Sequence, residues 1–212
     1  MQWKENSKQY ENPPAGSHLG RLVGLVDLGT QRHVFGEDVN LSRDVRLTFE
    51  LSNEKMQGVY DEKDRGKPFG VSRTVKQSLH AKATLRKLLE GWRGKKFSKE
   101  DIEKFDEKKL LGVAARLTLI ENGEYVNLES IAPVGKTEKV PKQINPTVYF
   151  SLDNFDEAVF NKLGKATQEK IAKSPEYAAL KRSNSSHDDS DNPGSEVVGE
   201  GEPSDSSEDE PF

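Results

Sequence analysis

An apolar run near the N-terminus, interrupted by regularly placed glycines, is the feature that most constrains the fold of this chain. Residues 19–29 read Leu-Gly-Arg-Leu-Val-Gly-Leu-Val-Asp-Leu-Gly, so Gly20, Gly24 and Gly29 break a strand-like pattern. Glycine inside a strand pattern indicates bulges or sharp bends, as at the corners of small barrels. The run therefore predicts a strongly curved first strand.

Strict alternation of apolar and polar residues predicts a second strand over residues 44–52. The residues expected to face the core are Val45, Leu47, Phe49 and Leu51, and those expected outside are Arg46, Thr48 and Glu50. Further strands are predicted over 69–77, 110–120, 125–131 and 147–151. Asn122-Gly123 lies between two of them and is a strong signal for a β-hairpin.

The periodicity becomes helical after the third strand. The residues that fall on one helical face are Ala81, Leu85, Leu88, Leu89 and Trp92. Ser78 is the predicted N-cap, and Gly91 or Gly94 is the predicted end. Ser98-x-x-Asp101 predicts a second, short capped helix, so that a helical insert occupies about 79–105. Amphipathic segments at 154–163 and 166–180 predict a C-terminal helical segment.

Charge divides the chain into a basic body and an acidic tail. Residues 183–212 hold ten acidic side chains and no Lys or Arg, whereas the whole chain has 32 basic and 36 acidic residues. Without those ten acids, residues 1–182 have 26 acidic and 32 basic side chains, a net charge of +6. A basic body with an acidic tail often accompanies nucleic-acid binding. The tail is too polar to form a core and is predicted to be disordered, as is a flexible arm over 1–14.

Several classes of function are excluded or disfavoured. The chain has no Cys, which rules out disulfides, Cys-ligated zinc and thiol catalysis. It has no apolar run of the roughly 18 residues that a membrane helix needs and no apolar signal region at its start. Its four histidines lack metal-ligand spacing, and no nucleotide-binding loop motif is present. The sequence predicts a cytoplasmic, non-enzymatic protein that needs no cofactor or metal.

The order of the predicted elements indicates a fold class. Three strands, a helix and a two-strand hairpin follow one another as in the OB-fold, a small Greek-key barrel. The predicted class is therefore mainly β with α: an OB-fold-like β-barrel over residues 15–180 with a helical insert, a C-terminal helical segment and the acidic tail. Strands of this fold commonly bind oligonucleotides, although a fold does not by itself define a function.

The C-terminal tip suggests a handle for a partner protein. The predicted partner-binding residues are Asp209, Glu210, Pro211 and Phe212. Here Phe212 would enter an apolar pocket while its carboxylate and the flanking acids meet basic residues around it. The alternative is a solubilising tail that ends in Phe by chance.

This ending resembles the tails of bacterial single-stranded DNA-binding proteins and their phage counterparts. The body, through residues 20–29, 78–92 and 111–113, resembles phage-encoded OB-fold single-stranded DNA-binding proteins. The resemblance implies a bacteriophage protein that binds single-stranded DNA during replication, recombination or repair in the infected cell. It also implies that the tip binds replication or recombination proteins.

Basic residues interleaved with aromatic ones suggest where DNA would bind. Single-strand binders need a positive groove for phosphates and aromatic rings for bases. Alternation places Phe69 on the same face as Val71 and Val75, so Phe69 is assigned to the core, and Arg73 on that face needs a separate explanation. Tyr60 is the preferred stacking residue, and Tyr125 is either core or platform. The predicted DNA-binding residues are Arg21, Arg43, Arg46, Tyr60, Arg65, Lys67, Arg73, Lys76, Arg116, Tyr125 and Lys142.

Two other functions stay open at this point. A small-barrel adaptor could use the acidic tail to mimic nucleic acid and engage a basic partner. A nuclease could use a carboxylate metal site built from Asp27, Glu50 and Glu129, although acids on strand faces are usually just solvated.

Overall fold

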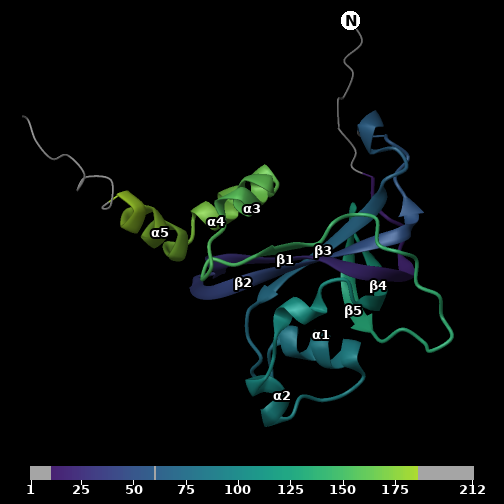
Figure 1. The fold of residues 1–212 in the computed structure, drawn as a ribbon, viewed down its shortest axis with the longest axis horizontal. Coiled ribbons are helices and arrows are strands. Elements are labelled where there is room, and N and C mark those ends of the chain that lie inside the picture. Colours follow the sequence, from purple (N-terminus) through teal and green to yellow (C-terminus); the bar gives the residue numbers. More distant parts are fainter. Residues whose placement is uncertain (1–10, 60, 186–212) are drawn as a thin grey trace, which may run out of the picture.

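A computed structural model describes residues 11–59 and 61–185 of the chain, and six strands within these residues form one sheet (Figure 1). The strands are β1 (Gly16–Phe35), β2 (Asp38–Lys55), β3 (Pro68–Lys76), β4 (Ala114–Asn122), β5 (Tyr125–Ala132) and β6 (Val148–Phe150). Five of them lie in the order β3-β2-β1-β4-β5 with antiparallel neighbours, and β6 pairs with β1 in parallel. The described part of the protein is therefore mainly β, as predicted.

The glycines of β1 mark the bends that the sequence predicts. The β1–β2 register shifts between Leu22 and Gly24 and again between Asp27 and Gly29. The bulges let the first part of β1 pair with β4 while its later part continues alongside β2. Gly29 has a positive φ of 70°, and a Cβ atom at this position would lie 2.5 Å from the Ser174 side chain. Both the backbone conformation and the close approach of the C-terminal helices therefore require glycine there.

Replacing Gly29 by alanine is expected to destabilise the fold more than the same change at Gly36. Both glycines have positive φ values, so both variants incur a similar backbone strain of roughly 1–2 kcal/mol. Nothing lies within 4 Å of a Cβ at Gly36, whereas a Cβ at Gly29 collides with Ser174 and Leu152. Overpacking of this kind adds about 1–3 kcal/mol. Urea denaturation of the two variants measures the difference, and equal destabilisation would contradict the proposed close approach.

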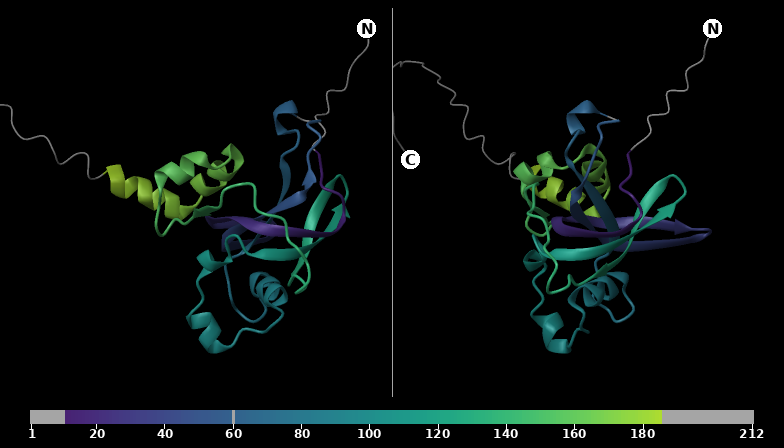
Figure 2. Two further views of the ribbon diagram at one scale, coloured as in Figure 1. Left: turned by 45° about the vertical axis from the view of Figure 1, so that its right-hand side comes forward. Right: turned by 90° about the vertical axis from the view of Figure 1, so that its right-hand side faces the viewer.

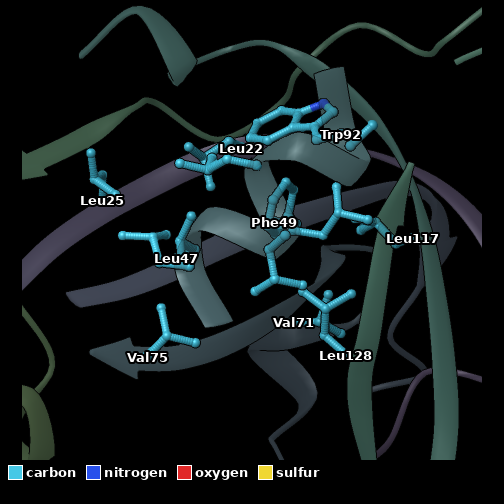
Figure 3. Close-up of a cluster of buried hydrophobic side chains, with 14 of the residues drawn as sticks. Leu22, Leu25, Leu47, Phe49, Val71, Val75, Trp92, Leu117 and Leu128 are labelled. Atoms are coloured by element: carbon cyan, nitrogen blue, oxygen red, sulfur yellow. The ribbon is translucent and has the colours of Figure 1, made fainter. Parts of the chain in front are cut away.

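The main core lies on the face of the sheet to which alternation assigns the apolar residues. Figure 3 shows Leu47, Phe49, Val71 and Leu117 converging from β2, β3 and β4. Phe69 is buried among them, as predicted. Trp92 packs against the core, and the centroid of its ring lies 5.4 Å from that of the Phe49 ring. Its indole N–H donates to the Ala114 carbonyl at 2.8 Å. These core positions are those expected from the two-residue period of each strand.

The helical insert begins later than predicted. α1 (Thr84–Arg93) has Ala83 as its N-cap, so the assignment of Ser78 to that position is wrong. The Ser78 hydroxyl instead accepts from the His80 N–H at 3.2 Å, which forms a local turn. α1 ends at Gly94 in the left-handed conformation, and α2 (Lys99–Glu103) has the predicted capping box. Short 3-10 turns, η1 (Glu62–Asp64) and η2 (Glu107–Leu110), complete the connections.

The C-terminal segment forms three helices around a second apolar cluster. They are α3 (Glu157–Lys162), α4 (Lys165–Ala172) and α5 (Pro175–Ser185). The cluster joins Val26 and Leu28 of β1 to Phe150, Phe160 and Ile171. Figure 2 shows these helices on one side of the sheet and the helical insert on the other. The segment predicted as one helix over 166–180 is divided at Ser174-Pro175, because proline cannot continue α4.

The two ends of the chain are described only in part. Residues 11–14, predicted to belong to the flexible arm, lie against the body: Asn12 Nδ2 donates to the Glu124 carbonyl, and Glu11 accepts from the Gln57 N–H. Residues 183–185, predicted to belong to the tail, are helical. The predicted arm residues 1–10, Tyr60, and the tail from 186 onward with its tip lie outside the described residues. Of the helices that are described, none is both long and apolar enough to cross a membrane.

Candidate nucleic-acid interface

The face of β2 and β3 opposite the main core is polar. Since Val45, Leu47 and Phe49 are buried in that core, the residues between them point to the other face. β3 alternates in the same way. We call this surface the outer strip, and it consists of Arg46 and Thr48 of β2 and Gly70, Ser72, Thr74 and Lys76 of β3. It lies on the side of the sheet from which α3–α5 and the loop containing η1 rise (Figures 1 and 2).

A hollow of about 390 Å³ lies between the outer strip and the C-terminal segment. Its floor includes Gly24 and Gly70 beside Val23 and Val26, and the hydroxyls of Thr48 and Ser72 lie 2.8 Å apart. Its wall includes Asn145, Pro146, Lys162, Leu163, Gly164 and Thr167. Glycines within strands let a ligand or another backbone approach the sheet closely.

Arg46 supplies a positive charge at this hollow. Its guanidinium is half-buried and donates to the Thr167 hydroxyl at 2.7 Å. Burial lowers the pKa of Arg46 from its usual value, but a guanidinium remains charged at neutral pH. Among the described residues no acid forms an ion pair with Arg46. A half-buried cation without a counter-charge favours an anionic ligand such as a phosphate.

A second, larger hollow of about 730 Å³ lies farther along the same face, beside α4 and the joined ends of β1 and β2. Cations from three elements line it: Arg32 of β1, Lys76 of β3 and Lys170 of α4. Phe35 lines it as well, with 69% of its surface exposed. The two hollows and the outer strip thus form one surface with cations at intervals.

Glu50, which alternation places on the same side, is a buried carboxylate that fixes the neighbouring loop. It is 0% exposed and accepts from the N–H groups of Ile144 and Asn145, at 2.8 and 2.6 Å, and from the Ser52 hydroxyl. Burial alone would raise the pKa of Glu50, but these three hydrogen bonds outweigh it and lower the pKa below its usual value. The carboxylate therefore stays ionised and holds the loop 133–147 beside the outer strip.

Asp27 is also buried, on β1, and is paired within the protein. Arg43 Nε donates to it at 3.2 Å, and the same guanidinium contacts Asp153. The Asp27 carboxylate raises the pKa of Arg43. Within the described part of the chain, no three His, Asp or Glu residues are placed to hold a metal ion. Asp27 and Glu50 are thus hydrogen-bonded within the fold rather than solvated.

Of the predicted DNA-binding residues, Arg46 and Lys76 belong to the outer strip. Arg65 and Lys67 lie in the loop between β2 and β3 and are exposed, with ion pairs to Glu62 and Asp64. Lys142 is exposed in the loop that Glu50 holds. These five are the predicted cations that the fold places in the outer strip or in the loops beside it.

Four other predicted cations are tied to the protein itself. Arg21 donates to the carbonyls of Pro141 and Gly112, and Arg43 is paired as described above. Arg116 pairs with Glu138 and donates to the Ser17 hydroxyl. Tyr125, left open as core or platform, is 62% exposed on β5, so it is not a core residue.

Arg73 is the fourth predicted cation that is tied to the protein itself, and the structure explains its place on the core-facing side of β3. Its Nη1 donates to the carbonyls of Leu128 and Glu129 on β5, both at 2.6 Å. β3 and β5 are the two edges of the sheet order, and in the described residues no ladder joins them. The guanidinium bridges these edges by side-chain hydrogen bonds. A closed barrel, predicted from the order of the elements, is therefore not confirmed by strand pairing.

Several residues of the surface were not predicted. Thr48 and Ser72 could have been found, since alternation places them next to Arg46 on the same face. Lys162 and Lys170 had no such signal, because nothing in a helical segment far along the chain indicates which face of the sheet it will cover.

Comparison of the chain with known protein families, curated proteins and solved structures finds no match in any of the three.

Proposed function

We propose that this protein binds single-stranded DNA along the outer strip, without sequence preference and without catalysing a reaction. The observation that supports this most is the charge pattern of one face: Arg46 and Lys162 line the first hollow beside glycine and hydroxyl residues, and Lys76 and Lys170 line the second. The buried acids Asp27 and Glu50 are hydrogen-bonded within the fold. Cations spaced along a groove suit the phosphates of a flexible single strand, whose release of counterions drives binding.

The strand order supports an OB-fold assignment for this sheet. In the order β3-β2-β1-β4-β5, with α1 inserted between β3 and β4, closure of the barrel would bring β3 beside β5. The hydrogen bonds from Arg73 join these two strands. OB-folds bind oligonucleotides on the face of their second and third strands and through the adjoining loops. The outer strip lies on the corresponding strands, β2 and β3.

The proposed role is to protect and organise single strands during replication or recombination. The resemblance of the tip to the tails of single-stranded DNA-binding proteins supports a second contact, in which Phe212 and the acids before it bind a replication or recombination protein. That part of the proposal concerns residues outside those the structure describes.

A binding titration tests the DNA proposal. The full chain is added to fluorescently labelled oligothymidylate in a chelating buffer, with the anisotropy followed at several salt concentrations and a duplex of equal length as competitor. We expect the logarithm of the affinity to fall linearly with the logarithm of the salt concentration. We also expect that the duplex does not displace the labelled single strand. Absence of binding at low salt would contradict the proposal and favour an adaptor. Cleavage that appears on adding a divalent cation would favour a nuclease.

A further inference from the structure

The joined ends of β1 and β2 carry exposed apolar side chains to which the DNA proposal assigns no role. Val34 of β1 and Val39 and Leu41 of β2 are 53%, 49% and 68% exposed. Val34 pairs directly with Val39, and Leu41 continues the side of β2 that forms the main core further along the strand. These three side chains therefore lie on one face of the ribbon, together with Arg32, which pairs with Leu41, and Leu41 also borders the second hollow.

One edge of this ribbon also lacks a neighbouring strand. Pairing between β2 and β3 begins at Asp44, opposite Lys76, and the Arg43 carbonyl accepts from the Gln77 N–H at 2.8 Å. Residues 38–42 have no partner on that side within the described structure. Backbone groups alternate in direction along a strand, so Val39 and Leu41 point their N–H and C=O groups to this free edge, as Arg43 does.

Lysine, proline and a bulge, which commonly protect a free edge, are missing here. Natural edge strands are shielded by lysine, proline or a bulge. The segment Asp38-Val-Asn-Leu-Ser42 contains neither lysine nor proline, and the β1–β2 register has no shift beyond Gly29. A free edge with exposed apolar side chains is suited to pair with another strand.

We propose that residues 38–42 of two copies of this chain pair in an antiparallel manner, with Asn40 opposite Asn40, to form a dimer with a continuous four-stranded ribbon. In this register Val39 of each copy faces Leu41 of the other. Asp38 faces the uncharged Ser42. Each apolar side chain on the edge therefore meets an apolar partner, and each acid avoids a like charge.

The neighbouring registers are less favourable. A shift that places Leu41 opposite Leu41 brings Asp38 against Asp44 of the other copy, and like charges directly opposite one another are destabilising. A shift that places Val39 opposite Val39 leaves only residues 38–40 paired within the strands and leaves Leu41 without a strand partner. The charge and apolar pattern of the edge thus selects one register.

Single cysteines test this register, because the chain has no native Cys. Asn40 lies between the edge-facing residues, so the Asn40 pair is a non-hydrogen-bonded pair with Cα atoms about 4.5 Å apart. That spacing permits a disulfide. Asn40→Cys should form a covalent dimer with a mild oxidant. Asp38→Cys is the matched control, since two copies of residue 38 lie four positions apart, roughly 13 Å, and it should not crosslink.

Sedimentation of the unmodified full chain without DNA provides the second measurement. A dimer is expected, and Leu41→Pro should convert it to a monomer, because proline removes an edge-facing N–H and leaves the β1–β2 pairing intact. Circular dichroism shows whether this variant is folded. A monomeric wild type at high micromolar concentration would overturn the proposal. So would equal crosslinking of the two cysteine variants, or a folded Leu41→Pro variant that stays dimeric.

Discussion

Replacing Glu50 by alanine is expected to lower the free energy of unfolding by roughly 3 kcal/mol or more, and to weaken DNA binding. The change leaves the N–H groups of Ile144 and Asn145 and the Ser52 hydroxyl without their acceptor. Each buried donor that loses its partner costs about 1–3 kcal/mol. The loop 133–147 would then leave its position beside the outer strip. Urea denaturation measures the first effect, and oligonucleotide titration of the folded variant measures the second.

Glu129→Ala is the matched control, since Glu129 is also a strand carboxylate but is exposed on β5. It should change stability by less than about 0.5 kcal/mol. The stabilisation of the fold by Glu50 should also depend on pH in a defined direction. Its pKa is lowered in the folded state, so its stabilisation is complete above the unfolded value of about 4.3 and is lost as the pH falls through the folded value. Equal effects of the two substitutions would contradict the role assigned to Glu50.

Removing three cations from the outer strip and its hollows is expected to reduce the affinity for single-stranded DNA on the order of 100-fold at low salt. The variant replaces Lys76, Lys162 and Lys170 by alanine, and all three side chains are exposed. Each lost phosphate contact should reduce the slope of log affinity against log salt by about 0.7. The slope should therefore become shallower by about 2 in total.

A control with the same loss of charge separates contacts from net electrostatics. Lys82, Lys87 and Lys99 are exposed in the helical insert, which lies on the other side of the sheet from α3–α5 (Figure 1). Their replacement by alanine should leave the salt slope nearly unchanged. If both triple variants lose the same affinity and slope, binding depends on overall charge, and the outer strip is not the site.

The strands could be predicted because their signals are local. Two-residue alternation placed Phe49 and Phe69 in the core, and Asn122-Gly123 identified the β4–β5 hairpin, where Gly123 has a φ of 62°. The start of α1 could not be predicted in this way. Ser78 suits both an N-cap and a local turn, and the turn formed. The extension of β1 and β2 beyond Gly29 into a ribbon also escaped prediction, because exposed strands lack a strong apolar period.

The candidate site was harder to predict because its cations are similar in sequence but have different partners in the fold. Arg46 and Arg73 both lie in apolar strands, yet one borders a hollow and the other binds carbonyls on β5, at residues 128 and 129. Arg21 likewise contacts Pro141, far along the chain. Which cation remains available to a ligand depends on long-range contacts, and these are not visible in a local pattern.

Photo-crosslinking from a single position tests the central claim most directly. Ser72→Cys places a reactive group on the exposed floor of the outer strip, in a chain without other cysteines, and Lys87→Cys places the same group on α1. With a photoreactive label and oligothymidylate in chelating buffer, the Ser72 derivative should crosslink to DNA and the Lys87 derivative should not. Crosslinking from Lys87 but not from Ser72, or from neither while the DNA is bound, would contradict the placement of single-stranded DNA on the outer strip.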